Sequence, residues 1–502
     1  MSTDNSGLID IHQMTQQDIF NILNLSDKLR KALKNHNSVD YKLAKEKDLL
    51  VASLFYENST RTRSSFEIAA IRLGLNVTGF GSIEGSSVKK GESLGHTLDM
   101  FDSYLCDAVI LRHPLDGSSV YASERISVPV FNAGDGKHQH PTQTMLDLYT
   151  ISRHLGRLEN FSIGFGGDLK YGRTSHSLVL ALSRFENISF YFYSHPSLAM
   201  PDYIVDALKE SKCNVTICND LEEAAETVDI FYMTRIQKER LPDIQEYEMA
   251  KKTAVFTPEI MAITGKTFGL MHPLPIDKSA PGILPELDSH PKSLYKRQAG
   301  NGVPVRMALL AASLGLVDEL SDFGKRKNNN PKNDFIRQME LNPGSRNREG
   351  VSIRPIRKCG VVIDHLVPWT ENILINLLNV RERRDIYRSA TVRSISRPDN
   401  IKGMLMIENR ELNTDELKII ATVSPGARVN VIHESTVVKK LELQLPDIVE
   451  DIRTVRCPNH GCISNPEHME HVAPKFHKIS STALRCHYCS TILPSSDLFI
   501  LN

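Results

Sequence analysis

The feature that most constrains this chain is the alternation of short β-rich runs with longer helical patterns between about residue 51 and residue 315. Such alternation is typical of α/β domains that are built on parallel sheets. The runs that predict strands are Val51–Tyr56, Ala108–Leu111, Phe161–Phe165, Ile188–Tyr193 and Asp229–Met233. This part of the chain should therefore form one α/β domain or a pair of them.

A change of composition ends this pattern. Residues 322–350 contain six Asn, seven Lys or Arg and four acidic residues, with few large apolar side chains. A segment of this composition cannot bury a core of its own. We therefore expect a linker here, with outer bounds at 319 and 352.

A second folded part is expected beyond the linker. Val361–Ile363 and Ala427–Ile432 have the β-rich character of strands, and Thr414–Ala421 has a helical pattern. These elements predict a small α/β unit over 353–450. Paired cysteines follow it and indicate a separate module over 451–502.

The overall charge excludes several classes of partner. Lys plus Arg and Asp plus Glu both total 60, so the formal net charge is zero and no global positive field attracts nucleic acid or anionic lipid. No apolar run approaches the roughly 18 residues that a membrane helix requires, and Met1–Asp10 lacks the basic and apolar regions of a signal peptide. We expect a globular cytoplasmic protein without a nucleic-acid or membrane partner, in which any anion site is local.

The segment from Asn58 to Glu67 is the strongest candidate for such an anion site. It reads NSTRTRSSFE and joins a predicted strand to a helix whose apolar residues recur at helical spacing up to Gly74. Free N–H groups and the positive dipole end of a helix attract anions, and the hydroxyls and guanidiniums add donors suited to phosphate oxygens. An ordinary N-cap with solvated arginines is the alternative, but a run of five consecutive donor side chains favours phosphate.

Further polar residues follow other predicted strands, where α/β proteins place ligands. Arg112 follows one apolar run, and Arg173 and Arg235 follow two others. Two planar guanidiniums suit a dicarboxylate, although each of them could instead form a surface ion pair. His138 and His140 could be half of a metal site, but no acidic or cysteine partner follows at a matching spacing, so an imidazole that donates to an oxygen is the better interpretation.

Two loops complete the polar candidates. Gly85–Glu92 is a basic loop bounded by glycines, of a kind that could fold over a bound anion, although a surface loop is the simpler interpretation. His272-Pro273-Leu274-Pro275 is a rigid turn whose carbonyl groups could face a ligand. Neither loop identifies a site by itself.

Two close pairs of cysteines near the C-terminus predict a metal site: Cys457, Cys462, Cys486 and Cys489. Four residues separate the members of the first pair, two separate those of the second, and 23 lie between the pairs. Two thiolate pairs with this spacing close a tetrahedral structural zinc site, whereas disulfides or unrelated thiols are less expected in a reducing compartment. His460 and His487 could compete as ligands, but four thiolates already fill the shell.

These segments together closely resemble the catalytic chain of aspartate carbamoyltransferase, in order and spacing, over roughly residues 8–316. The motifs that carry the resemblance are STRTRSSFE (59–67), KKGES (89–93), LRHP (111–114), HQHPTQT (138–144), GDLKYGRT (167–174), YMTRIQKER (232–240) and HPLP (272–275). Ornithine carbamoyltransferase, the nearest relative, has a cysteine where Pro273 stands. Ile276 is a departure, because the family usually has Arg there.

The resemblance implies the organisation of this part. It predicts a carbamoyl-phosphate-binding domain over 1–145, an aspartate-binding domain over 146–300 and a helix over 301–318 that returns to the first domain. It also implies a homo-oligomer built from trimers, in which neighbouring chains share active sites. Ser86 and Lys90 should reach the site of the adjacent subunit.

Beyond the linker, the chain resembles the regulatory subunit of the same enzyme, which is usually a separate polypeptide. Val362–His365, Ile407–Asn409 and Cys457–Ser464 carry this resemblance. It implies a regulatory-chain-like allosteric domain over 353–450 and a zinc-binding module over 451–502, with one structural zinc ion per chain. The expected fold class is therefore α/β, with two parallel-sheet carbamoyltransferase domains followed by a small α+β regulatory domain and a β-rich zinc module.

The resemblance also implies the reaction and its residues. It predicts attack of the L-aspartate amine on carbamoyl phosphate, an early step of pyrimidine biosynthesis, without a catalytic cofactor. The catalytic residues would be Arg61, Thr62, Arg112 and His140. These four would bind carbamoyl phosphate together with Ser59, Thr60, Gln143, Leu274 and Pro275. Aspartate would be bound by Lys90, Arg173, Arg235 and Gln237, and Glu57 would align Arg112 and Arg173.

Other function classes stay open. A carbamoyltransferase for a different amine and a non-catalytic zinc-containing scaffold that binds RNA or protein are both compatible with parts of the sequence. The presence of every polar residue named above argues against a decayed, non-catalytic chain. The neutral overall charge argues against RNA.

The residues that match the family's nucleotide effector site are Asp364, His365, Lys402 and Lys440. Two departures weaken this match. Met406 stands where a lysine is expected and cannot donate to phosphate, and Ser435 stands where a tyrosine is expected. We therefore expect a weakened or absent response to CTP and ATP, unless Lys439 or a nearby arginine compensates.

Overall fold

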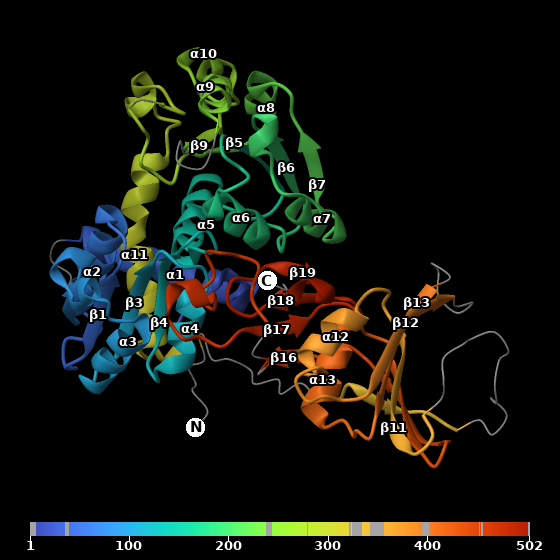
Figure 1. Ribbon diagram of the computed structural model, residues 1–502. Helices are drawn as coiled ribbons and strands as arrows, with labels where there is room; N and C mark the ends of the chain where they lie inside the picture. Colours follow the sequence, from blue (N-terminus) through green and yellow to red (C-terminus); the bar gives the residue numbers. More distant parts are fainter. Residues whose placement is uncertain are drawn as a thin grey trace. The chain divides into compact units, whose positions relative to one another are not determined.

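The computed structural model divides into two compact units, Met1–Lys327 and Asn328–Asn502 (Figure 1). It describes residues 7–35, 40–236, 243–278, 280–320, 323, 334–341, 356–393, 401–450, 452 and 455–499. Gln237 therefore lies outside the described residues. Each unit is described by itself below.

The N-terminal half of the first unit is built on a parallel four-stranded sheet. Its strand order is β2-β1-β3-β4, formed by β1 (Leu50–Phe55), β2 (Asn76–Phe80), β3 (Ala108–His113) and β4 (Val130–Asp135). The helices of this half are α1 (Gln16–Lys34), α2 (Thr60–Leu73), α3 (Leu94–Ser103), α4 (Ser118–Arg125) and α5 (Pro141–Leu155). β1, β3 and β4 are buried almost throughout, as expected for a parallel sheet covered on both faces.

The second sheet of this unit is also parallel. Its order is β7-β6-β5-β8-β9, formed by β5 (Phe161–Gly166), β6 (Ile188–Tyr193), β7 (Asn214–Ile217), β8 (Ile230–Met233) and β9 (Gly269–Met271). Its helices are α6 (Arg173–Leu182), α7 (Asp202–Glu210), α8 (Leu221–Thr227), α9 (Ile244–Thr253) and α10 (Pro258–Ile263). The two parallel sheets confirm the α/β prediction.

One long helix returns from the second sheet to the first. α11 (Tyr295–Ser313) contacts α1, α2 and α5, and most of its side chains are buried. In Figure 1 it runs alongside α5 from the second sheet toward the first. α5 and α11 therefore connect the two sheet regions.

All five predicted strands of this unit are present, with ends that differ by at most two residues. The sequence patterns do not indicate β2, β4, β7 or β9. All four lie at sheet edges. Two of them, β2 and β7, are also largely exposed, so their residues lack an apolar pattern. β9 is only three residues long, which is too short for periodicity to reveal.

The second unit begins with an antiparallel six-stranded sheet in the order β10-β15-β14-β11-β13-β12. Its strands are β10 (Ile336–Gln338), β11 (Cys359–Leu366), β12 (Tyr387–Arg393), β13 (Ile401–Glu408), β14 (Arg428–His433) and β15 (Thr436–Leu443). Two helices, α12 (Glu371–Leu377) and α13 (Thr414–Val423), lie on one face of this sheet (Figure 1). Sheet and helices form the expected α+β arrangement.

The predicted linker contains one of these strands, which corrects its description. β10 lies within 319–352 and pairs with β15, with Ile336 opposite Leu443. Phe335 is buried next to it. Composition averaged over the segment hides these two apolar residues, because Asn and basic residues surround them.

A small antiparallel sheet ends the chain. Its order is β16-β17-β18-β19, formed by β16 (Ile448–Glu450), β17 (Lys475–Lys478), β18 (Ala483–Cys486) and β19 (Ile492–Pro494). Phe476 is fully enclosed at its centre. Across the residues that the structure describes in both units, no helix is long and apolar enough to cross a membrane.

Candidate active site

A cleft of about 680 Å³ lies within the first unit, where several parallel strands end. Its wall takes residues from the carboxyl end of β3 and from the loops that follow β1, β5, β8 and β9, together with α5 and α11. Open α/β sheets bind ligands at this edge. Most of the residues that the sequence assigns to carbamoyl phosphate and aspartate line this one cleft: Ser59, Thr60, Arg61, Thr62, Arg112, His140, Gln143, Arg173, Arg235, Leu274 and Pro275.

The turn after β1 has the geometry of an anion site. Ser59 is the N-cap residue of α2, and its side chain makes no cap hydrogen bond. Gly74 ends the helix in the left-handed conformation, as the sequence predicts. The hydroxyl of Ser59 and the first N–H groups of α2 are therefore available to phosphate oxygens.

The arginines of this helix have different environments. Arg61 lines the cleft, whereas Arg63 Nε lies 2.7 Å from Glu67 Oε1 in an ion pair along the helix. Glu67 also accepts a hydrogen bond from Ser53 at 3.2 Å. The two arginines look equivalent in the motif, but in the structure Arg61 lines the cleft and Arg63 forms an ion pair within the helix.

Arg112 is the most enclosed arginine donor from the first sheet. Its Nη1 donates to the Ala133 carbonyl at 3.1 Å, and its Nη2 lies 3.3 Å from Glu57 Oε2. Burial lowers the pKa of Arg112, while Glu57 acts in the opposite direction, so the guanidinium stays charged at neutral pH. Its Nε is buried without a hydrogen-bond partner among the described residues. Glu57 thus forms an ion pair with Arg112.

Gly134 lets two arginines approach the same point. A Cβ at this position would lie 2.8 Å from Arg112 Nη1 and 3.1 Å from Arg173 Nη2, and the backbone φ of +117° also favours glycine. Arg173 donates to the carbonyl of Gly136. Two guanidiniums held this close create a local positive field that suits an anion between them.

His140 and Gln143 lie at the start of α5. Burial, followed by the charges of Arg173 and Arg112, holds the pKa of His140 well below its ordinary value, so the imidazole is neutral. His140 Nδ1 lies 3.5 Å from Thr142 Oγ1. A neutral imidazole can donate one hydrogen bond to a ligand oxygen. His138 instead contacts Asp135, with 3.0 Å between Nδ1 and Oδ2, and among the described residues the two histidines belong to no group that could hold a metal ion.

The turn after β9 supplies backbone groups to the cleft. His272 is buried there, and burial, reinforced by Arg61 and Arg235, lowers its pKa to about 3. Its Nδ1 accepts from the Leu274 N–H at 2.8 Å, which orients the turn. Its Nε2 has no partner among the described residues. Leu274 has a φ of +58°.

Two of the predicted residues that the structure describes, Ser86 and Lys90, are not brought to this cleft. Ser86 and Lys90 lie in a short helical loop away from its wall, and the Ser86 hydroxyl donates to the Ile83 carbonyl at 3.0 Å. Gln237 lies outside the described residues. Ile276, the departure from the family pattern, is partly buried against the core of the second sheet.

Sequence reasoning does not find two residues of the cleft wall that lie on α11. These are Gln298 and Arg306. Arg306 is buried on α11 with its guanidinium 4.8 Å from the centre of the Phe66 ring, and burial lowers its pKa to about 9. Residues on α11 carry no local motif, because it is the packing of this helix against α1, α2 and α5 that brings them to the site.

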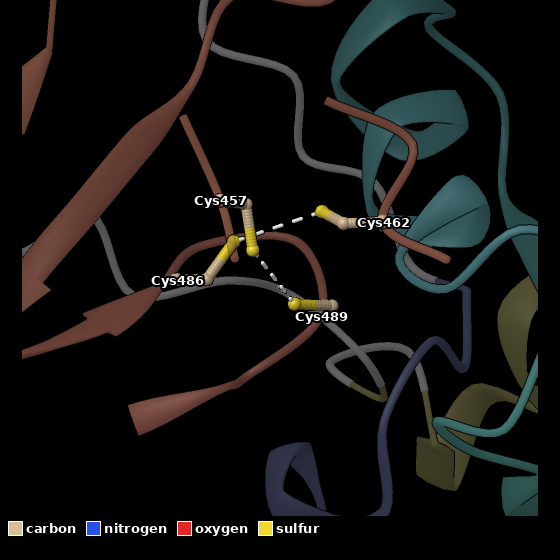
Figure 2. A group of neighbouring side chains, drawn as sticks. All are labelled: Cys457, Cys462, Cys486 and Cys489. Carbon is tan, nitrogen blue, oxygen red and sulfur yellow. Dashed lines mark hydrogen bonds between the residues drawn. The ribbon is translucent and has the colours of Figure 1, made fainter. Parts of the chain in front are cut away.

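The four paired cysteines of the second unit converge on one point (Figure 2). All four Sγ atoms lie within 4.8 Å of one another, with 3.5 Å between Cys457 and Cys489 and 3.8 Å between Cys462 and Cys486. A zinc tetrahedron with bonds of about 2.3 Å has edges of roughly 3.8 Å. The four side chains are buried and free of disulfides, so they form a tetrahedral site for a structural metal.

The competing histidines are not part of this cluster. His460 Nδ1 lies 3.8 Å from Glu467 Oε2, and His487 Nδ1 lies 2.8 Å from His477 Nε2. Among the residues that the structure describes, the cysteine cluster is the group suited to hold a metal ion. Four sulfur ligands leave no open position, so the metal there is structural.

The predicted effector residues lie in two rows on one face of the six-stranded sheet. Paired positions in an antiparallel sheet share a face. One row contains Lys440, Asn430, Val362, Met406 and Arg388. Met406 therefore lies in the same row as Lys440.

The neighbouring row is internally neutralised. Asp364 pairs with Arg428, and Arg428 with Glu442. Lys402 Nζ lies 2.7 Å from Asp364 Oδ1, and His365 Nδ1 lies 3.1 Å from Asp364 Oδ2. Although burial raises the pKa of Asp364, the hydrogen bonds from His365 and Lys402 outweigh it and hold that pKa well below its ordinary value. The charge of Lys402 thus already faces a carboxylate.

Four protein-family models match consecutive parts of the chain. They are described as the carbamoyl-phosphate-binding domain of aspartate/ornithine carbamoyltransferase (residues 7–153) and its Asp/Orn-binding domain (159–313). The other two are the allosteric domain (351–444) and the metal-binding domain (447–498) of the aspartate carbamoyltransferase regulatory chain.

Curated relatives agree with the first two models. The aspartate carbamoyltransferase catalytic subunit of Thermococcus kodakarensis is 45% identical over 311 residues, which are 62% of this chain and 97% of the relative. The corresponding subunit of Methanocaldococcus jannaschii is 44% identical over 304 residues, which are 60% of this chain and 96% of the relative.

Solved structures give the same result. The catalytic subunit of M. jannaschii aspartate transcarbamoylase has a TM-score of 0.57 and 42% identity, over 63% of this chain and 99% of that one. Aspartate transcarbamoylase from Trypanosoma cruzi, in complex with carbamoyl phosphate and aspartate, has a TM-score of 0.56 and 31% identity, over 62% of this chain and 97% of that one. The chain belongs to the aspartate carbamoyltransferase family, and it joins the catalytic-chain and regulatory-chain regions in one polypeptide.

Proposed function

We propose that this protein transfers the carbamoyl group of carbamoyl phosphate to the amine of L-aspartate, giving N-carbamoyl-L-aspartate and phosphate. The amine nitrogen attacks the carbonyl carbon, the bond from that carbon to the phosphate oxygen breaks, and the departing phosphate takes the amine proton. The observation that carries this proposal is the arginine-lined cleft at the strand ends. The positive field of these arginines would hold two anionic substrates side by side.

The first part of the mechanism is charge stabilisation. Ser59, Thr60 and the start of α2 are placed to bind the phosphate, with Arg61 and Arg112 beside them. Arg112, Thr62 and the neutral His140 would polarise the carbonyl oxygen. Negative charge grows on these oxygens in the transition state, so preorganised donors are worth more there than in the ground state.

The second part is orientation. Gln143 and the carbonyl of Pro275 would accept hydrogen bonds from the carbamoyl amino group, and this turns the carbonyl carbon toward the amine. Arg173, Arg235 and Gln237 would hold the two aspartate carboxylates. Juxtaposition of two bound substrates supplies much of the rate, since a bimolecular step becomes effectively unimolecular.

The cleft would be completed by a neighbouring chain. Ser86 and Lys90 lie away from the cleft of their own chain, so a homo-oligomer built from trimers would bring them to the adjacent site. Lys90 is exposed and carries a charge suited to phosphate or carboxylate oxygens. Sharing of this kind makes isolated chains inactive.

Product formation with different amines tests the activity. Purified protein is mixed with carbamoyl phosphate and either L-aspartate or L-ornithine, and the carbamoylated amino acid is identified. We expect carbamoyl aspartate and no carbamoyl ornithine. A product with another amine alone would support the second carbamoyltransferase class, and no product with any amine would support a scaffold.

The metal of the second unit is proposed to be zinc, one ion per chain. The four thiols of the cluster fit zinc by number, spacing and burial, and free thiols of this kind are kept reduced in the cytoplasm. Elemental analysis should find about one zinc per chain. Cys457→Ser should lose the metal and unfold the terminal module, whereas Cys106→Ser, at a scattered buried cysteine, should keep the metal.

Regulation by nucleotides is proposed to be weak. The face that carries Asp364, Lys402 and Lys440 is the family's effector region, but Met406 interrupts its basic row. An effector shifts an enzyme only by its different affinity for two states. Because this face offers fewer donors to a triphosphate, CTP and ATP would bind the two states of the enzyme with little difference in affinity.

A further inference from the structure

Asp147 is a buried acid beneath the cleft that the mechanism above does not use. It lies on α5, and its side chain is fully enclosed, with 0% of the residue exposed. Gln143 Nε2 and Gln298 Nε2 donate to its Oδ1 at 2.9 and 2.7 Å, and the Tyr232 hydroxyl donates to its Oδ2 at 2.8 Å. This carboxylate therefore joins α5, α11 and β8 at one point.

We propose that Asp147 is a positioning residue that holds Gln143 with its amide oxygen free for the carbamoyl amino group, a role that rests on the function proposed above. An ionised carboxylate only accepts hydrogen bonds, so a carboxamide beside it must present its nitrogen. Because Nε2 of Gln143 is committed to Asp147, the amide oxygen is the atom left to accept from a donor in the cleft. A group that does not touch the substrate thus sets the direction of one that does.

The same rule orients Gln298 and extends the network to the turn after β9. The nitrogen of Gln298 faces Asp147, and its Oε1 accepts the backbone N–H of His272 at 3.0 Å. His272 Nδ1 in turn accepts from the backbone N–H of Leu274 at 2.8 Å. One carboxylate therefore also supports the turn that carries Pro275, the second acceptor proposed for the carbamoyl amino group.

The Arg306 charge and the three hydrogen-bond donors favour the ionised form in which this network works, whereas burial opposes it. Burial raises the pKa of Asp147 to about 7, against the lowering influence of Gln298, Tyr232, Gln143 and the Arg306 guanidinium. Protonation would turn one acceptor oxygen into a donor and break a bond to one of its three donors. Arg306 of α11 and Tyr232 of β8 are the titratable groups that face Asp147.

Asp147→Asn tests this role at constant size. The Asn amide carries N–H donors of its own, so it no longer imposes one direction on Gln143. We expect kcat to fall at least about tenfold, while KM for carbamoyl phosphate and for aspartate changes less than about threefold, because the arginine anchors are intact. Wild-type kcat in this variant would overturn the proposal.

Thr150→Val is the matched control. Thr150 lies one turn further along α5 and accepts from Asn301 Nδ2 of α11 at 2.9 Å, so it repeats the link between the two helices away from the cleft. We expect kcat within about twofold of wild type, because a lost structural hydrogen bond costs stability and not transition-state binding. An equal loss of kcat in both variants would mean that Asp147 only joins the helices.

A pH profile gives a readout that packing alone would not move. Wild-type kcat should fall as the pH drops through the Asp147 pKa near 7. His140 and His272 do not account for this limb, since burial holds the pKa of each far lower. In Asp147→Asn the limb should be absent.

Tyr232→Phe keeps the test valid even if Asp147→Asn does not fold. It removes one donor to the carboxylate without loss of ring volume, so the pKa of Asp147 should rise and the acid limb should move to higher pH by about half a unit or more. An absent or unmoved limb would overturn the positioning role. A wild-type chain that forms no carbamoyl aspartate would instead refute the proposed function, so the two failures are distinguishable.

Discussion

The cleft of the first unit and the helix-free face of the six-stranded sheet both gather basic side chains, but they neutralise them to different degrees. In the cleft, Glu57 lies 3.3 Å from Arg112, but a second guanidinium, that of Arg173, approaches the same point beside Gly134. On the sheet face, Lys402 lies 2.7 Å from Asp364, and Met406 interrupts the row that contains Lys440. Basic residues in a motif therefore do not by themselves indicate an anion site; what counts is whether nearby carboxylates have already taken the charge.

Removing one charge from each region gives the largest expected contrast. Arg112→Ala should lower kcat at least about a hundredfold, because a charge-assisted donor to the developing oxyanion is lost. Lys402→Ala should leave kcat of the uninhibited enzyme within about twofold, because its charge is already paired with Asp364 and it does not line the cleft. Steady-state rates of the two purified variants check this.

His140→Ala refines this result within the cleft. Its imidazole is neutral and is one of several donors, so the loss of kcat should be smaller than for Arg112→Ala. Near-normal kcat in Arg112→Ala would contradict the assignment of the cleft, and complete inactivation by His140→Ala would give the imidazole a larger role.

The two regions should also differ in whether a single chain supplies all of their residues. The predicted effector residues on the sheet face all come from one chain, whereas the cleft should need Lys90 of a neighbour. Lys90→Ala and Arg61→Ala chains should each be inactive alone, but mixed trimers should recover activity, because some sites then draw both intact residues from different chains. Activity is measured after the two chains are dissociated and reassembled together. Verified mixed trimers without recovery would exclude shared sites.

The cleft should also differ from the second unit in how its thermal stability depends on pH, which is a smaller effect. The pKa of His272 is about 3 in the folded chain, against an ordinary value near 6.5. A depressed pKa means that unfolding takes up a proton below pH 6.5, so its stabilising contribution is complete above pH 6.5 and declines as the pH falls toward 3. The slope is about 1.4 kcal/mol per pH unit for one proton. The cleft should therefore lose thermal stability on acidification.

His272→Asn should flatten this pH dependence by about one proton, since Asn can still accept from the Leu274 N–H but does not titrate. Loss of activity on heating between pH 5 and 8 follows the cleft. The single tryptophan, Trp369, is 71% exposed in the second unit, so its fluorescence follows that unit alone and serves as the control. An identical slope in wild type and variant would contradict the assignment of the titration to His272.

The smallest expected effect belongs to the sheet face. CTP or ATP should shift half-saturation by aspartate less than about twofold, because the basic row lacks the lysine that Met406 replaces. Aspartate saturation curves with and without each nucleotide test this, and Met406→Lys is the informative variant. A several-fold shift in the unmodified protein would show that Lys439 or another basic residue completes the site.

Local sequence patterns predicted the parts of the molecule that short segments control. The bounds of α2 follow from a strand, a hydroxyl-rich turn and Gly74, all between Leu50 and Gly74. The cysteine cluster follows from two short spacings. Both depend on the intrinsic geometry of turns and on ligand chemistry, and neighbouring residues largely set these.

Residues with little local pattern escape this kind of prediction. The strand β10 has only three residues in a segment rich in Asn and basic side chains, and pairing with β15 decides its structure. The edge strand β2 is similar, because its exposed residues show no apolar alternation. In both cases the strand exists because a partner strand offers free hydrogen-bonding groups.

The sequence by itself thus determined which residues could bind an anion or a metal, since side-chain chemistry and spacing are written in it. Only the tertiary structure decided which charges are available and which acids support the site. Asp147 meets Tyr232 and Gln298 across 85 and 151 residues of chain, and Lys402 meets Asp364 across 38. Such contacts between residues that are distant in the sequence form when packed elements bury these groups and exclude water. A change in one group's partner then alters the charge that a ligand encounters.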